Sequence, residues 1–396
     1  MEKVNRITFK GQPVFWILLV FIYIVSVLEV FSATSRMTFG ADDSYMWPVL
    51  KHIFFLVIGF VCLYLIHRSS ERWLKYLPLV LLGIAGLVLI YLFFLKRRWL
   101  VLFGISLQPS EFAKIGVIGA VAMMLSKLDV GDRESQKRTF VNICLLTGTV
   151  CLLIFPVNLS TSILLALIVF CMMWVGQVHR KYLLPLFLTA AILGSGFVFI
   201  CLTTSPQRMK ELTATTPLPE RALTWQARVV DFVTPDTNCE PAVYAKTVAR
   251  DKTQETHANI AIARSSLIGC LPGNSVERDF IQEASCDYIF AIIIEELGLF
   301  GALGVMFLYF MLVLKTGGVA VRCAPHSYFR YLLLGIAMLI GFQALINMSV
   351  AVGIMPVTGQ PLPLISTGGS SILATSIAVG MVICVSRITL EGAADA

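Results

Sequence analysis

The chain alternates long apolar runs with short polar connections along most of its length. Several runs approach the roughly 20 apolar residues that a helix needs to cross a bilayer core of about 30 Å. The pattern therefore predicts an all-α, polytopic membrane protein with about ten transmembrane helices. These helices are expected at residues 13–33, 48–66, 76–95, 110–126, 140–155, 159–176, 182–203, 287–314, 330–351 and 370–386.

The first apolar run, residues 13–31, is too long for the apolar region of a signal peptide, which spans about 7–15 residues. No A-x-A cleavage site follows it, so we expect a retained first helix. The composition agrees, because 57% of the 396 residues are hydrophobic and only 14% are charged, with a mean hydropathy of +0.81. Ordinary soluble domains carry about 25% charged residues. We expect a single transmembrane domain over residues 1–396.

Lysine and arginine residues gather in the short connections on one side of the predicted helices. Because cytoplasmic connections are usually positive, both termini are predicted to be cytoplasmic. The long segment at about 204–286, between the seventh and eighth spans, is then extracytoplasmic, and such long translocated segments largely escape the charge rule. The net charge of +7 is explained by this topology, so we expect no nucleic-acid partner.

Three consecutive basic residues, Lys96 to Arg98, break the charge rule in a short outer connection. They suggest an anion held at the outer surface. Glu111 and Lys114 follow at the start of the fourth span, three positions apart and hence on one helical face. Ionisable residues inside a membrane are usually paired and often functional. Two compatible interpretations stay open: a structural salt bridge, or Lys114 binding a phosphate together with Arg97 and Arg98.

The stretch "EASCDYIFAIIIEELG" at 283–298 places three acids in an apolar setting. Ser285 or Asp287 could cap the eighth helix. Alternatively, Asp287 is a general base at the boundary between water and lipid. Glu295 and Glu296 lie about 12 Å deeper along the helix. They point in different directions, and structural contacts explain them better than a proton path.

Residues 355–371, "MPVTGQPLPLISTGGSS", are too rich in Pro and Gly to be helical throughout. Non-helical backbone at membrane depth is tolerated where it is buried or lines a cavity, so we expect a re-entrant loop at the outer face. Three cysteines, Cys239, Cys270 and Cys286, lie outside the spans, and they are compatible with one disulfide and a free thiol or with no disulfide. No Cys/His spacing indicates a zinc site.

The unusual polar features all lie on the predicted outer side: the basic cluster, the Glu111–Lys114 pair, the long segment, Asp287 and the Gly/Ser-rich loop. A cavity there that opens to lipid would suit an amphiphile with a charged head and a long apolar tail. The residues alone do not identify the substrate or the reaction.

Several stretches together resemble the SEDS family (shape, elongation, division and sporulation), the FtsW/RodA-type peptidoglycan polymerases. They are "RRW" at 97–99, "QPSEFAK" at 108–114, "IAIARSSLIGCLPGNSVERDF" at 260–280, "CDYIFAIIIEELGLFGA" at 286–302 and "MPVTGQPLPLISTGGSS" at 355–371. They follow the family order and fit ten spans. The "PGNS" and "RDF" segments are more similar to FtsW, the septal branch, than to RodA.

The resemblance implies polymerisation of lipid II, an undecaprenyl-diphosphate-linked disaccharide-pentapeptide, at the outer face of the cytoplasmic (inner) membrane. The family's essential aspartate falls on Asp287, which would deprotonate the acceptor sugar. Arg97, Arg98 and Lys114 would bind the leaving diphosphate, with a divalent cation such as Mg²⁺ or Mn²⁺ as a candidate cofactor. The implied substrate-binding set is Arg97, Arg98, Lys114, Glu111, Gln108, Ser370 and Ser371. The implied partners are a class B penicillin-binding protein transpeptidase and other proteins of the division septum.

The chain departs from the family pattern at several positions. Ser285 and Cys286 replace the usual His-Thr pair before the aspartate, and Asn158 stands where an acid is usual, which weakens any metal role there. Thr367 replaces the Tyr of the "SYGGSS" motif. Two other functions stay open. A lipid II flippase would need a polar lining in both leaflets. A non-catalytic scaffold of the division machinery would not need Asp287.

Overall fold

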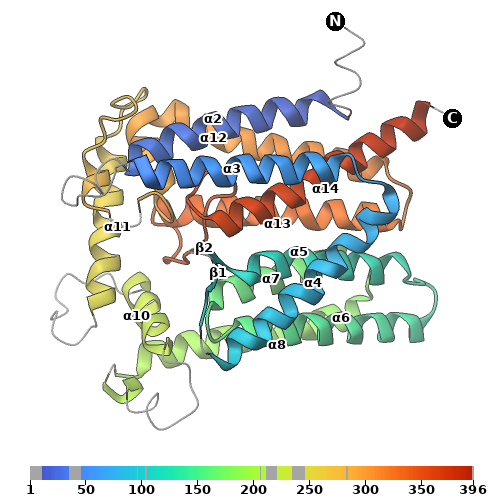
Figure 1. Cartoon of the computed structure of the whole chain (residues 1–396). Helices are drawn as coiled ribbons and strands as arrows, with labels where there is room; N and C mark the ends of the chain where they lie inside the picture. The colour runs from blue at the N-terminus through green and yellow to red at the C-terminus, as the bar shows by residue number, and fades with distance from the viewer. Residues whose placement is uncertain are drawn as a thin grey trace, which may run out of the picture.

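The protein is a bundle of long helices, most of whose axes are roughly aligned with one another (Figure 1). The computed structural model describes residues 11–34, 46–95, 97–102, 105–205, 207–210, 221–233, 246–281 and 284–394. The long helices are α2 (Pro13–Thr34), α3 (Met46–His67), α4 (Glu71–Phe94), α5 (Pro109–Ser126), α6 (Arg133–Ile154), α7 (Leu159–Val175), α8 (Arg180–Thr203), α12 (Ile289–Arg322), α13 (Tyr328–Ala351) and α14 (Gly369–Ala394).

These helices lie where the apolar runs predict membrane spans. Nine helices in the described ranges are long and apolar enough to cross a membrane, and α7 is a shorter apolar helix of 17 residues. Several helices extend beyond the predicted spans, as α12 does by continuing to Arg322. The reason is that a helix can continue past the apolar stretch into a polar connection. The all-α membrane fold is thus confirmed.

The helices form two groups (Figure 1). In the first group α14 packs mainly against α3, and α12 packs against α13 and α2. In the second group α4 packs against α5, and α6 packs against α7. Contacts of α13 with α5 and α7 join the two groups. Among the candidate spans α5 is the most buried and α8 the least, so α5 forms much of the core.

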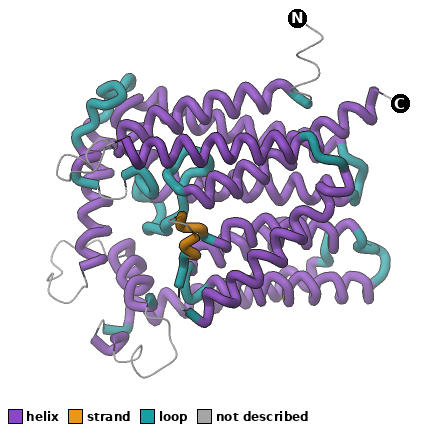
Figure 2. The backbone as a smooth tube through the Cα atoms, viewed as in Figure 1, coloured by secondary structure: helices purple, strands orange, loops and turns teal. Residues whose placement is uncertain are grey.

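A short antiparallel hairpin precedes α5, which sequence periodicity did not predict. Its strands are β1 (Leu100–Leu102) and β2 (Ile105–Leu107), with Leu100 opposite Leu107. Figure 2 shows the hairpin beside non-helical segments that lie between the two helix groups. The hairpin returns the chain, so the residues just before β1 and just after β2 come close together.

The segment between α8 and α12 is not a structureless loop. It contains α10 (Ala222–Val233), α11 (Lys246–Arg264) and the short 3₁₀ helix η2 (Glu277–Asp279). Figure 1 shows α10 and α11 at one end of the bundle, whereas α2 begins and α14 ends at the other end. This arrangement agrees with an even number of spans. Which end faces the cytoplasm stays a prediction.

Helix α12 is broken at Gly298, where the sequence predicts a continuous helix. Gly298 has φ 69° and ψ −171°, a backbone conformation essentially restricted to glycine. The preceding segment fills the break: Cys270 N donates to the carbonyl oxygen of Glu295 at 3.0 Å, and Leu299 N donates to that of Ser266 at 3.2 Å. The break thus depends on a partner segment about 30 residues away, which helical periodicity does not reveal.

Candidate active site

Asp287 lies in an irregular segment that leads into α12, and distant residues hold its backbone. Asn347 Nδ2 donates to the carbonyl oxygen of Asp287 at 3.1 Å and to that of Gln360 at 2.8 Å. Ser366 Oγ donates to the carbonyl oxygen of Cys286 at 2.6 Å. The segment between α13 and α14, predicted as a re-entrant loop, therefore positions the aspartate together with Asn347 of α13.

The N-cap position of α12 is neither Ser285 nor Asp287. Tyr288 is the N-cap residue of α12, and its side chain makes no capping hydrogen bond. Ser285 instead contacts the loop before α14, since Thr367 Oγ1 lies 3.0 Å from both the carbonyl oxygen and the hydroxyl of Ser285. Asp287 precedes the cap position and is half-buried.

The side chain of Asp287 lines a cavity with a volume of about 480 Å³. Predicted site residues from three parts of the chain line the same cavity: Arg98, Gln108, Glu111, Ser370 and Ser371. Ser370 and Ser371 begin α14 and are buried, and Ser371 Oγ has no hydrogen-bond partner in the described structure. The cavity thus presents a carboxylate, a guanidinium and hydroxyl groups to one space.

The hairpin brings Arg98 beside Gln108. Arg98 Nη2 donates to Gln108 Oε1 at 3.4 Å, and Gln108 Nε2 donates to Ser110 Oγ at 2.9 Å. Pro109 occupies the first turn of α5, where its missing N–H costs no hydrogen bond.

Two kinds of neighbour act on the Arg98 guanidinium. Burial lowers the pKa of Arg98 from its ordinary value, and the nearby Arg221 lowers it further. Asp287 and Glu111 act in the opposite direction and raise this pKa. The Arg98 guanidinium thus interacts both with another guanidinium and with the predicted catalytic carboxylate, which line the same cavity.

Glu111 and Lys114 form the ion pair that their spacing predicts. Lys114 Nζ lies 2.9 Å from Glu111 Oε1, and the side chains are only 1% and 5% exposed. Lys114 is not among the residues that line the cavity, whereas Glu111 is. Lys114 thus reaches the site through its partner.

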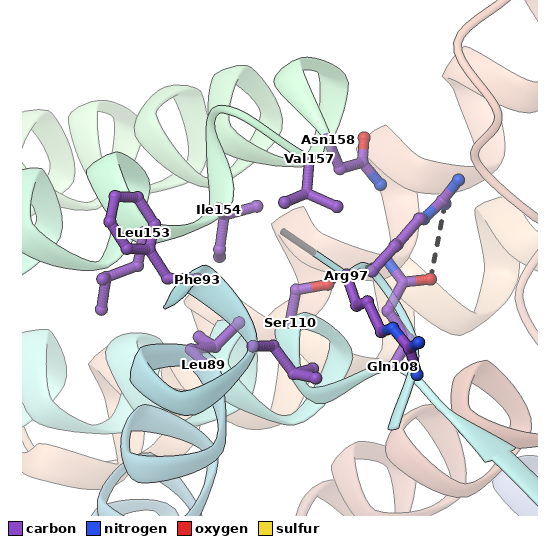
Figure 3. A pocket seen from close by; sticks show the side chains of 11 residues that line it. Leu89, Phe93, Arg97, Gln108, Ser110, Leu153, Ile154, Val157 and Asn158 are labelled. Atoms are coloured by element: carbon purple, nitrogen blue, oxygen red, sulfur yellow. Dashed lines mark hydrogen bonds between the residues drawn. The ribbon is translucent and has the colours of Figure 1, made fainter. Parts of the chain in front are cut away.

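Arg97 does not line the cavity of Asp287. It is exposed, and it shares a small pocket of about 20 Å³ with Arg98 and Gln108, between α4, α5, the end of α6 and the start of α7. Figure 3 shows this pocket, with Arg97 near Gln108 and with Asn158 above them in the view. Asn158 caps α7 by accepting from Thr161 N at 3.2 Å, so the amide keeps the capping role that an acid also supports.

A second, larger cavity adjoins the first. It has a volume of about 900 Å³ and extends along α7, α8 and α13 to the loop before α14. Most of its lining is apolar, with residues such as Leu164, Phe197 and Phe342. Asp287 and Arg98 line both cavities. We call the smaller cavity the polar cavity and the larger one the apolar groove. The two meet at Asp287.

Comparison with known proteins identifies the fold and family. The model of the FtsW/RodA/SpoVE family, described as cell cycle protein, matches residues 12–390. This chain belongs to that family. A protein of Nitrosococcus halophilus described as a probable peptidoglycan glycosyltransferase FtsW is 30% identical over 365 residues, covering 89% of this chain and 84% of that protein.

Two solved structures share the fold of this FtsW/RodA family member. A chain from a peptidoglycan synthase complex has a TM-score of 0.72 at 24% identity, covering 96% of this chain and 98% of that chain. The rod shape determining protein RodA of Thermus thermophilus has a TM-score of 0.64 at 23% identity, covering 95% and 97%. These structures support the helical membrane fold alone.

The two deeper acids of α12 have structural contacts, as in the preferred interpretation. Glu295 accepts from Ser275 Oγ and from Val276 N, the latter at 3.1 Å. Glu296 accepts from Ser32 Oγ of α2 and from Ser275 N. These carboxylates hold the segment before η2 against the bundle. They are absent from the lining of both cavities.

The described residues do not fit a metal site built by this FtsW/RodA chain alone. No group of three or more His, Cys, Asp or Glu residues in the described ranges could hold a metal ion. Two carboxylates line the cavity, and that of Glu111 is paired with Lys114. Cys270 and Cys286 are free thiols, so the disulfide interpretation fails for this pair. Cys239 lies outside the described residues.

Sequence reasoning missed two arginines of the site, Arg221 and Arg228, which line both cavities. They lie seven positions apart around α10, with Thr224 and Trp225 between them on the same lining face. This helical spacing was readable in the sequence. The signal was overlooked because the charge rule excuses basic residues in a long outer segment.

Proposed function

We propose that this protein is a peptidoglycan glycosyltransferase that polymerises lipid II at the outer face of the cytoplasmic membrane. One observation carries the proposal: the carboxylate of Asp287 lies where a polar cavity meets a large apolar groove. An amphiphilic substrate with a sugar-diphosphate head and a polyprenyl tail has this same division. The family relatives described as peptidoglycan glycosyltransferases support the same activity.

In this proposal Asp287 is the general base. Its carboxylate takes the proton of the acceptor's 4-hydroxyl, and the oxygen then attacks the anomeric carbon of the donor. The bond between that carbon and the diphosphate oxygen breaks, and undecaprenyl diphosphate leaves with the electron pair. A positioned general base contributes about 10²- to 10⁴-fold to such a step.

The other predicted residues have proposed roles that follow from their places. Arg98 faces Asp287 and would offset the charge that develops on the diphosphate. Gln108, Ser370 and Ser371 would bind sugar hydroxyls in the polar cavity. The buried Glu111–Lys114 pair would fix the wall of the cavity and add positive charge behind it. Arg97 lies too far to the side to line the cavity, so a role at the entrance fits it better.

The partners and the location are also proposed. A glycan strand must be crosslinked to become cell wall, so a class B penicillin-binding protein transpeptidase is the proposed partner, within the septal division machinery of the inner membrane. The relatives named FtsW support the septal role over a role in elongation. A Mg²⁺ or Mn²⁺ ion bound mainly by the diphosphate remains a prediction.

The test is to supply lipid II to the purified protein with its transpeptidase partner and to separate the products by gel electrophoresis. The proposal expects glycan polymer. The same protein in vesicles that carry fluorescent lipid II in one leaflet measures movement between leaflets. Movement without polymer would favour the flippase, and neither activity in a correctly folded complex would favour the scaffold.

A further inference from the structure

Three arginines gather where the polar cavity meets the apolar groove. Arg98, Arg221 and Arg228 line both spaces, together with Asp287. A ligand that extends from the groove into the cavity must pass these guanidinium groups. The junction is therefore defined by cations, with the predicted base beside them.

Helix α10 is anchored so that it presents this face. Gln226 Nε2, on the other face, donates to the carbonyl oxygens of Cys201 and Thr204 at 3.1 and 2.6 Å. Trp225 packs against Phe155, with ring centroids 5.2 Å apart. These contacts hold α10 to the end of α8 and to the connection between α6 and α7, while its arginine-bearing face lines the groove.

Arg221 has donor capacity left for a ligand. Its Nη1 donates to the carbonyl oxygen of Val157 at 2.6 Å, whereas a guanidinium carries five N–H donors in a planar fork. Arg221 is exposed and Arg228 is half-buried. A fork of this kind matches the oxygens of a phosphate group.

The charges at the junction favour a polyanion. Burial lowers the pKa of Arg221, and the nearby Arg228 lowers it further. Among the described residues, Asp287 carries the one carboxylate that lines both cavities, and the charge of Glu111 is already paired with Lys114. A diphosphate would relieve the repulsion between guanidinium groups because it brings several negative oxygens between them.

We propose that Arg221 and Arg228 bind the diphosphate of the donor lipid, with its polyprenyl tail in the apolar groove. This inference rests on the proposed function and adds two binding residues that lie outside the stretches quoted for the resemblance. When the bond between sugar and diphosphate breaks, the electron pair stays on the diphosphate oxygen, and the guanidinium groups stabilise that charge. In this arrangement the acceptor sugar binds in the polar cavity, on the other side of Asp287.

The test compares Arg221→Gln and Arg228→Gln with a matched control, Arg208→Gln, whose arginine is exposed and lines neither cavity. Binding of undecaprenyl diphosphate, undecaprenol and inorganic pyrophosphate to the full-length protein in detergent is measured by calorimetry. We expect each site variant to lose about 10- to 100-fold in affinity for undecaprenyl diphosphate, as removal of a charge-assisted contact does. Affinity for undecaprenol should not change, which also verifies folding, and the control should match the wild type.

Unchanged affinity for undecaprenyl diphosphate in both site variants would overturn the assignment. Equal affinity of the wild type for inorganic pyrophosphate and undecaprenyl diphosphate would refute the groove as the tail site. An equal loss for undecaprenol would mean a structural role. Lipid II polymerisation is measured in parallel, so that this inference and the proposed function can fail separately. Polymer formation by the wild type supports the proposed function. If both variants also form polymer with the wild-type KM for lipid II, the inference alone is refuted.

Discussion

Asp287 combines a polar surrounding with an apolar one, and its neighbours explain how that position is maintained. Ser366 of the loop before α14 and Asn347 of α13 hold the backbone there, by donating to the carbonyl oxygens of Cys286 and Asp287. The side chain faces Arg98 across the cavity. A short carboxylate fixed in this way can reach a hydroxyl group without moving its own backbone. The buried Glu111–Lys114 pair is a second interaction between individual residues that supports the site, since Glu111 lines the cavity and Lys114 lies behind it.

Loss of Lys114 should destabilise the protein because it leaves the Glu111 carboxylate buried without its partner. Lys114→Met is expected to cost roughly 3–5 kcal/mol, and the double variant Glu111→Gln/Lys114→Met much less. The measurement is the thermal unfolding midpoint in detergent.

Arg138→Met is the matched control, since Arg138 pairs with Glu134 at 2.7 Å but both side chains are more than 70% exposed. Such an exposed pair is worth about 0–1 kcal/mol. If Lys114→Met melts at the wild-type temperature, the buried pair has no structural weight.

At the scale of elements, the long outer segment contributes structure to the site at two places. Helix α10 supplies the arginine-bearing face at the junction of the cavities. The segment after α11 completes the break in α12 through backbone hydrogen bonds with Glu295 and Leu299. The break lies about three helical turns beyond Asp287.

Gly298→Ala should prevent normal folding of this region. The added Cβ would overlap the backbone of Gly269, and the backbone conformation itself costs alanine on the order of 1–3 kcal/mol. Gly304→Ala on the same helix meets open space, and it should be neutral or slightly stabilising. The two variants are compared by unfolding midpoint and by protease resistance of the outer segment. Equal stability of both would contradict the described break.

An element can be predicted from the sequence when the residues that determine it are its own neighbours along the chain, and not when they belong to a distant segment. The ten long helices follow from local apolar runs, because bilayer burial acts on each run separately. The ion pair of Glu111 follows from helical spacing. The hairpin before α5 and the break at Gly298 could not be read, since each depends on contacts that the local pattern does not encode. The helical spacing of Arg221 and Arg228 was readable, but the charge rule attaches no meaning to basic residues in a long outer segment.

At the scale of the whole molecule, the bundle places its functional features at one end. Helices α10 and α11 lie there, and the chain begins α2 and ends α14 at the opposite end (Figure 1). A protein that polymerises an exported lipid-linked sugar needs its cavity on the outer side. The sidedness predicted from the basic connections is therefore a direct requirement of the proposed function.

Cysteine labelling tests the sidedness. Cys270 is exposed on the outer segment, and in a Cys239→Ser/Cys286→Ser background it should react with a membrane-impermeant maleimide in intact spheroplasts. Asp129→Cys, at an exposed position between α5 and α6, should react only after permeabilisation. Cys270→Ser is the labelling control. The reverse pattern would place the cavity at the cytoplasmic face.

The central claim is that the Asp287 carboxylate catalyses glycan polymerisation. The most direct measurement is the rate of lipid II polymerisation by the purified protein with its transpeptidase partner, compared with Asp287→Asn and with the control Asp279→Asn. Asp279 is a half-exposed acid on η2 that lines neither cavity. Asp287→Asn should lose at least about 100-fold in rate while it retains the wild-type unfolding midpoint, and Asp279→Asn should polymerise normally. Polymerisation by Asp287→Asn at the wild-type rate would contradict the account.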